Sequence, residues 1–94
     1  MELDEKLTFT FFHVCSSLSE ENVKAVDFLL RLNLDDRWPK LEPLTAIAVL
    51  TKMKELGMWK VNIQLKEWEF SKLFILLDNI GRQDLSSALL DLGH

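Results

Sequence analysis

The stretch Phe70-Ser71-Lys72-Leu73-Phe74-Ile75-Leu76-Leu77-Asp78-Asn79-Ile80 carries the clearest structural signal in the chain. Its main apolar residues recur at the i, i+3, i+4 and i+7 spacing of an amphipathic helix. Ile75 and Leu76 place further apolar surface on other sides of the same helix. A helix that is apolar on most sides usually lies at the centre of a bundle. We therefore expect a central helix from about Glu67 to about Ile80, in an all-α fold.

The N-terminal segment has an ambiguous pattern. Residues 7–11 alternate with period two, as in a strand, yet Leu7, Phe11, Val14 and Leu18 also follow helical spacing. No second strand is evident for this segment to pair with, and an isolated strand is not stable. The sequence therefore predicts a helix from about residue 2 to about residue 16.

A second helix is predicted to start after Ser19, which is a suitable N-cap and is followed by two glutamates. Val23, Val26 and Leu30 share one side of it, which we call the inner arc of the second helix. The helical pattern fades near Leu32. Residues 33–42 are polar, and they indicate a loop with one short helical turn.

The remaining chain predicts two more helices around the central one. Pro43 suits the first turn of a helix that runs to about Leu56 and ends at Gly57. Residues 58–66 alternate apolar and polar, and we interpret them as a connecting loop whose apolar groups fold back on the core. A last helix is expected from about Asp84 to about Leu92.

Size and charge limit the classes of partner. The chain has 94 residues, which suits one domain over residues 1–94. Its net charge of -4 repels phosphate backbones and argues against nucleic acid as a partner. The opening residues lack a signal-peptide pattern, and no apolar run approaches the roughly 20 residues that span a bilayer. We expect a cytoplasmic protein that binds neither nucleic acid nor membrane.

Catalytic chemistry has little support in the sequence. Cys15 is the single cysteine, and His13 and His94 are the two histidines. His13 and Cys15 are two positions apart, so on a helix they point in different directions. No Cys or His pair has zinc-ligand spacing, and no glycine-rich phosphate loop is present. The sequence thus predicts a protein that is not an enzyme and holds no cofactor or metal.

Several large apolar residues lie away from the predicted core. Phe28 falls roughly opposite the inner arc of the second helix, at about 100° per residue, and Leu29 lies at the edge of that arc. Such a residue contacts either a partner or a neighbouring helix, and the sequence alone slightly favours the neighbouring helix. Phe9 and Phe12 lie away from the apolar stripe of the first helix, and Ile47 lies next to the apolar arc of its own helix. Burial is the simpler interpretation for these three residues.

Three stretches make the sequence resemble the death effector domain, a branch of the death-fold superfamily. They are residues 17–23 with Asp27-Phe28-Leu29-Leu30, residues 41–57, and residues 76–85, which contain the Arg-x-Asp-Leu motif as Arg82-Gln83-Asp84-Leu85. The order and spacing of the stretches are more specific than any one alone, and the likeness covers residues 3–92. It implies a six-helix antiparallel bundle with Greek-key topology.

The resemblance also implies a function. Death effector domains bind one another in apoptosis signalling, within adaptors, initiator caspases or inhibitors. Phe28 and Leu29 would enter an apolar groove between helices one and four of a neighbouring domain. Such a contact permits a homo-oligomer or a filament, because donor and acceptor surfaces differ.

A polar cluster is the second implied feature. It would link an acidic residue of the second helix to Arg82 and Asp84. This sequence has Asn22 where the acidic residue is expected, and Glu20 or Glu21 could substitute for it. The connection over 58–66 is also longer than the family pattern. The candidate partner-binding residues are Phe28, Leu29, Asn22, Arg82, Asp84, Leu85, Glu20 and Glu21.

Two other functions remain open. A caspase-recruitment or pyrin-type domain would keep the death fold but pair mainly through charged patches, whose contacts weaken as ionic strength rises. A small helical enzyme or ligand carrier would need an apolar pocket with converging polar groups.

Overall fold

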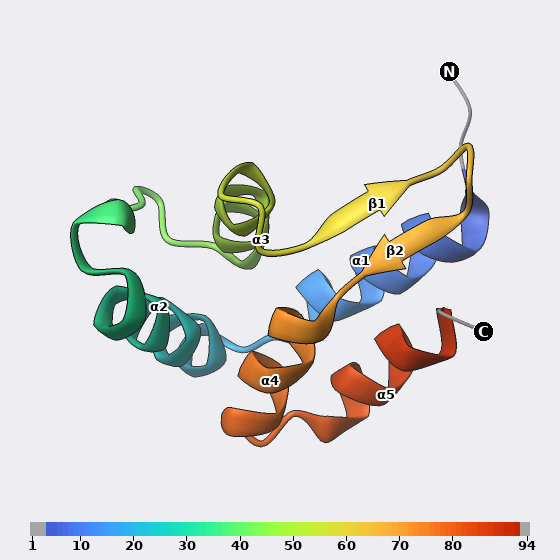
Figure 1. Ribbon diagram of the computed structural model, residues 1–94. Helices are drawn as coiled ribbons and strands as arrows, with labels where there is room; N and C mark the ends of the chain where they lie inside the picture. The colour runs from blue at the N-terminus through green and yellow to red at the C-terminus, as the bar shows by residue number, and fades with distance from the viewer. Residues whose placement is uncertain (1–3, 93–94) are drawn as a thin grey trace.

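The computed structural model describes residues 4–92, and these residues form five α-helices, one 3-10 turn and a two-stranded sheet (Figure 1). The helices are α1 (Glu5–Ser17), α2 (Glu20–Leu34), α3 (Ala46–Glu55), α4 (Ser71–Asn79) and α5 (Gln83–Leu92), with the turn η1 at Asp35–Arg37. The strands are β1 (Lys60–Asn62) and β2 (Glu67–Glu69). A mostly helical fold, expected from the sequence, is therefore confirmed.

The helices pack around one shared core. α4 contacts α5 on one side and α2 on the other, while α1 contacts α5 and α3 (Figure 1). The side chains that are almost completely buried come from all five helices: Val14, Leu30, Met53, Leu73, Leu85 and Leu89. Within residues 4–92, no helix is long and apolar enough to cross a membrane.

The start of α2 follows the sequence closely. Ser19 and Asn22 form a reciprocal capping box, in which each side-chain oxygen accepts a 3.1 Å hydrogen bond from the other residue's backbone N–H. The inner arc of the second helix is buried as predicted. The helix continues to Leu34, two residues beyond the predicted end, and η1 follows it in the predicted loop.

The third helix begins later than expected. α3 starts at Ala46, so Pro43 lies before the helix and not in its first turn. The reason is the side chain of Thr45, whose hydroxyl accepts a 3.1 Å hydrogen bond from the backbone N–H of Ala48 and caps the helix there. At the other end, Gly57 has φ 77°, a left-handed conformation that favours glycine, as the sequence predicted for a C-cap.

The connection between α3 and α4 is a β-hairpin, so two sequence predictions are wrong here. Residues 58–66 are not simply a loop, and Glu67–Glu69 form a strand, not the start of a helix. The strands pair antiparallel, with Val61 opposite Trp68. The Trp68 indole N–H donates a 2.9 Å hydrogen bond to the backbone oxygen of Leu92. This distant contact helps to hold β2 out of the helix that its local sequence favours.

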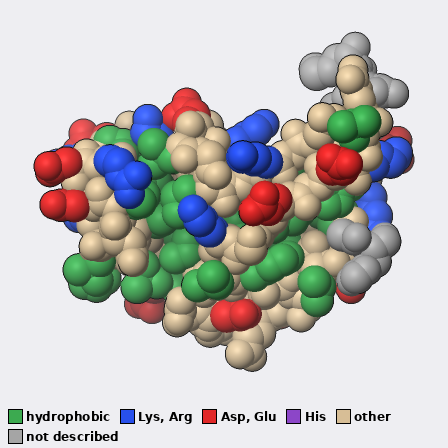
Figure 2. Space-filling view, viewed as in Figure 1, with side chains coloured by type: hydrophobic (Ala, Val, Ile, Leu, Met, Phe, Trp, Pro, Cys, Tyr) green, Lys and Arg blue, Asp and Glu red, His purple; other side chains and the backbone are tan. Residues whose placement is uncertain are grey.

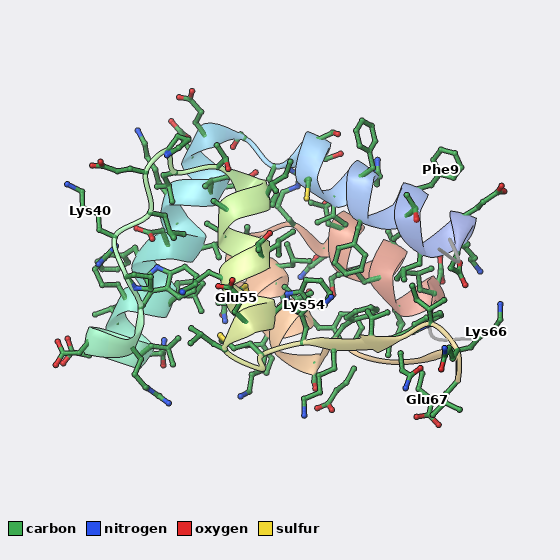
Figure 3. The ribbon with its side chains drawn as sticks, turned by 90° about the horizontal axis from the view of Figure 1, so that it is seen from above. Phe9, Lys40, Lys54, Glu55, Lys66 and Glu67 are labelled. Atoms are coloured by element: carbon green, nitrogen blue, oxygen red, sulfur yellow. The ribbon has the colours of Figure 1, made fainter. Side chains whose placement is uncertain are left out.

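The hairpin also contacts the start of the first helix. Lys66 lies at the turn of the hairpin (Figure 3), and its ammonium is 3.6 Å from the Asp4 carboxylate. Asp4 is the N-cap of α1 and accepts a 3.0 Å hydrogen bond from the backbone N–H of Leu7. That hydrogen bond, helped by Lys66, holds the pKa of Asp4 below its ordinary value. The hairpin therefore joins the beginning of α1 to the end of α5.

An aromatic cluster holds the helical segment over residues 7–11 against the rest of the fold. Phe11 stacks on Trp59 with ring centroids 4.8 Å apart and meets Phe70 edge-on at 5.3 Å. The Trp59 indole N–H donates a 2.9 Å hydrogen bond to the backbone oxygen of Leu50. Phe11 thus joins α1 to the base of the hairpin and to the start of α4.

The expectation of burial is wrong for Phe9, Phe12 and Ile47, whereas Phe28 is exposed, as the predicted partner contact requires. Phe9, Phe12 and Ile47 are 69%, 70% and 68% exposed, and Phe28 is 60% exposed. Each lies on the solvent side of a helix whose opposite side is already packed on the core. No neighbouring helix covers Phe28 within the described chain, so its ring stands in solvent.

Candidate interaction surface

The solvent side of α2 carries an apolar ridge. Phe28 and Leu32 are one helical turn apart and are both largely exposed, and we call this pair the outer ridge of α2. Leu29 lies beside the ridge and is half-buried against the core. Figure 2 shows apolar side chains gathered over α2 and continuing over α4. Large exposed apolar patches on soluble domains are often sites of protein contact.

A hollow of about 330 Å³ lies next to the outer ridge, between α2 and α4. Leu29 and Asn33 line its α2 side, and Ile75 lines its α4 side. Ile75 is 59% exposed, so it extends the apolar surface across the hollow. Neither Leu32 nor Ile75 was predicted from the sequence to belong to this surface. Leu32 could have been found, because it lies four residues after Phe28 and therefore shares its side of the helix.

A brace of three side chains fixes the part of α2 that carries the ridge. Asp27 accepts a 2.7 Å hydrogen bond from the indole N–H of Trp38, which is buried. The Arg31 guanidinium lies 3.3 Å from the same carboxylate. Trp38 follows η1, so this brace ties the end of the turn back to α2. The outer ridge is therefore presented on a fixed helix.

A second hollow, of about 380 Å³, opens between α1, the first turns of α2 and the start of α3. Its apolar lining includes Cys15 and Leu18 of the α1 segment and Leu44 before α3. Glu20 and Lys24 add one charge of each sign.

Arg82 is the centre of a polar cluster at the start of α5. Its guanidinium donates hydrogen bonds to the backbone oxygen of Ser17 at 2.7 Å and to the side-chain oxygen of Asn22 at 2.9 Å. It also holds the Asp84 carboxylate through two hydrogen bonds, at 3.1 and 3.0 Å. The structure thus brings together Asn22, Arg82 and Asp84, which the sequence analysis had grouped.

The charges of Arg82 and Asp84 stabilise each other. The hydrogen bonds and charge of Arg82 lower the pKa of Asp84 below its ordinary value. The same contact raises the pKa of Arg82. Asn22 contributes a neutral oxygen, which makes a weaker bond than a carboxylate would. The cluster therefore has one cation and one anion, and Asp84 is its more exposed member.

Three other predicted site residues lie apart from the cluster's hydrogen bonds. Glu20 and Glu21 are exposed in the first turn of α2, and neither forms an ion pair with Arg82. Their negative charges still stabilise the N-terminus of α2, where the helix dipole is positive. Leu85 is completely buried in the core. Its side chain supports the position of α5 and does not reach the surface.

His13 and Cys15, the residues considered for catalysis, both lie on α1. The His13 ring lies 3.4 Å from the Ser17 hydroxyl on the exposed side of α1. Cys15 is half-buried, and its removal from water raises the pKa of its thiol. Among residues 4–92, no three His, Cys, Asp or Glu side chains are grouped so that they could hold a metal ion.

Comparison with protein-family models, with curated proteins and with solved structures finds no match to this chain. Its function therefore has to be argued from the surface itself.

Proposed function

We propose that this chain is an interaction module of the death effector type, which recruits or co-assembles with related domains. The observation that carries the proposal is the outer ridge of α2. Phe28 stands in solvent on a helix that is capped at its start and braced through Asp27. An exposed aromatic side chain on a fixed helix is the usual anchor of a protein interface.

The remaining geometry supplies a receiving surface. The hollow between α1 and α3 has a partly apolar lining made of different residues from the ridge, and it begins at Lys24, one helical turn before Phe28. In the proposed contact, Phe28 and Leu29 of one domain enter this hollow on the next. Glu20 and Lys24, which also line it, would set the register through charge. Because the two surfaces differ, the contact repeats head to tail and forms open assemblies.

The Arg82 cluster supports the proposal indirectly. It ties the end of α1 and the start of α2 to the start of α5. These are the elements next to the receiving hollow, so the cluster holds one wall of that hollow in place. The charges of Asp84 and of Glu21 are left exposed for a partner.

The test is the substitution Phe28→Asp. We expect it to abolish the capture of other death effector domains in a pull-down, because a carboxylate would have to be buried in an apolar contact. Its melting temperature should stay close to wild type, since the ring is exposed. The matched control is Leu65→Asp, at an equally exposed leucine in the hairpin turn, which should bind normally. Undiminished capture by Phe28→Asp, or its unfolding, would refute the proposal.

A salt titration separates this proposal from a caspase-recruitment or pyrin-type domain. A contact anchored by Phe28 should weaken only slightly between about 0.05 and 0.5 M salt, because apolar contacts are not screened. A contact carried by charged patches should weaken steeply over the same range. Steep weakening would assign the domain to one of those other branches.

A further inference from the structure

The connector between α1 and α2 is only two residues long, and it consists of Leu18 and Ser19. Leu18 is half-buried and lines the hollow between α1 and α3, which we call the receiving hollow. The backbone of Leu18 is extended and no longer helical. Within residues 4–92, α1 and α2 pack more closely on other helices than on each other. The place of Leu18 in the wall therefore depends on how the connector is held.

Arg82 holds this connector from both sides. One nitrogen of its guanidinium, Nη1, donates a 2.7 Å hydrogen bond to the backbone oxygen of Ser17, the residue before Leu18. The same nitrogen donates a 2.9 Å hydrogen bond to the side-chain oxygen of Asn22. That oxygen also accepts the backbone N–H of Ser19. A single nitrogen thus fixes the last residue of α1 relative to the first turn of α2.

The rest of the guanidinium fixes its orientation. Nε and Nη2 hold the carboxylate of Asp84 at 3.1 and 3.0 Å. Asp84 lies in the first turn of α5, which packs on α1 and α4. The carboxylate therefore sets the plane of the guanidinium and leaves Nη1 directed at the connector. A lysine could not replace it, because an ammonium group lacks the planar fork that makes these contacts together.

We propose that Arg82 is a positioning residue for the receiving hollow and that it acts through Leu18. Without the fork the connector is released, and Leu18 no longer completes the wall that meets the incoming ridge. The outer ridge of α2 does not depend on this clamp, because the brace from Asp27 to Trp38 holds the helix beside Phe28. Arg82 therefore serves the receiving side of the contact and not the donating side. The inference rests on the proposed function, which assigns the hollow its occupant.

Two starting proteins separate the two sides of the contact. Phe28→Asp loses the anchor of the ridge, so it can receive a ridge but not offer one. Leu44→Asp places a carboxylate in the lining of the receiving hollow, so it can offer a ridge but not receive one. Titration calorimetry of one protein against the other measures a single head-to-tail contact.

Arg82→Met is then added to each starting protein in turn. This variant keeps most of the aliphatic stem and removes every hydrogen-bond donor. In the receiving protein we expect the Kd to rise about tenfold, and in the donating protein the rise should be at least about five times smaller. Arg82→Lys, which keeps the charge without the fork, should show the same asymmetry. An equal loss in both proteins, or no loss in the receiving protein, would overturn the proposal.

Trp68→Phe is the matched control for a general loss of stability. It removes the hydrogen bond from the hairpin to Leu92, far along the chain from the connector. Placed in the receiving protein, it should lower the melting temperature and change the Kd by less than about twofold. A loss of affinity as large as that of Arg82→Met would show that any destabilisation weakens the contact, and would refute a specific role for Arg82.

The thiol of Cys15 gives a readout that needs no partner. Cys15 is half-buried and lines the receiving hollow together with Leu18. Release of the connector should expose it, so Arg82→Met should react with a thiol reagent at least about three times faster than wild type, and Trp68→Phe should not. An unchanged rate in Arg82→Met would contradict the clamp even where head-to-tail binding is found. Absence of binding between the two starting proteins would instead refute the proposed function, and the thiol rates would still decide whether Arg82 holds the wall.

Discussion

The Arg82 guanidinium donates a 2.9 Å hydrogen bond to the side-chain oxygen of Asn22, and so joins the start of α5 to the first turn of α2. The same oxygen accepts the backbone N–H of Ser19 in the capping box. Asn22 therefore caps its own helix and holds a distant one. A substitution of Asn22 should therefore alter both the cap of α2 and the contact of α2 with α5.

Asn22→Asp should stabilise the protein at neutral pH. A carboxylate there would pair with Arg82, and it would also place negative charge in the first turn of α2, where the helix dipole favours it. We expect the melting temperature to rise by a few degrees, and to fall in Asn22→Ala, which removes the shared oxygen. Scanning calorimetry at pH 7 measures both. Equal melting temperatures for the two variants would show that the oxygen of residue 22 does not hold α5.

Asp84→Asn should change how stability depends on pH. Because Arg82 lowers the folded pKa of Asp84, this carboxylate stabilises the fold at pH values above its ordinary pKa of 3.8. The contribution is lost as the pH falls below that value and through the folded pKa. The variant should therefore melt lower than wild type at pH 7, and the difference should shrink between pH 5 and pH 3.

Ile75→Asp tests whether the proposed binding surface extends from α2 to α4. Ile75 is exposed on the far side of the hollow beside the outer ridge. If a partner covers this hollow, the substitution should weaken binding by roughly 10- to 100-fold, as for a residue close to an interface anchor. Surface plasmon resonance against a captured death effector domain measures the affinity. Unchanged binding would confine the surface to Phe28 and its neighbours on α2.

Trp68→Ala tests the contribution of the hairpin to stability. The substitution removes a half-buried ring and its hydrogen bond to Leu92, so we expect the free energy of unfolding to fall by about 1–3 kcal/mol. In Trp68→Phe the free energy of unfolding should fall by only about 1 kcal/mol. This variant loses the hydrogen bond to Leu92 but keeps most of the ring contacts. Urea titration followed by circular dichroism gives both values. A hairpin that contributes nothing would leave both variants as stable as wild type.

The thiol of Cys15 should react slowly in the folded protein. Burial raises its pKa, so less thiolate is present at pH 8 than in a free cysteine. We expect an aromatic disulfide reagent to modify the native chain more slowly than free cysteine, and urea to remove the difference. A native rate equal to that of free cysteine would place this side chain in full contact with water.

The helices were predictable because their signals are local. The capping residues around Ser19 and the buried spacing of Val23, Val26 and Leu30 lie within one element, so the sequence shows both the start and the inner side of α2. Arg82 and Asp84 could be grouped with Asn22 only through the family resemblance. The 2.7 Å bond from Arg82 to the backbone oxygen of Ser17 had no sequence signal, since any residue supplies such an oxygen.

The hairpin was missed because its stability is not local. Glu67–Glu69 contain residues that also suit a helix, and Phe70 continues the spacing of the helix that follows. The strand forms because Trp68 lies opposite Val61 and binds Leu92, contacts that only the folded chain creates. The exposure of Phe28 was uncertain for a related reason. Helical spacing shows which side faces away from the inner arc, but not whether another helix covers that side.

The hairpin that reaches both Asp4 and Leu92 has a consequence for how the chain acquires its structure. The contact with Asp4 requires α1 to be in place and the contact with Leu92 requires α5 to be in place, and each closes a long loop between distant residues. The hairpin should therefore complete late in folding and open early in unfolding. Native-state hydrogen exchange would detect this order as weaker protection of Val61 than of Leu30.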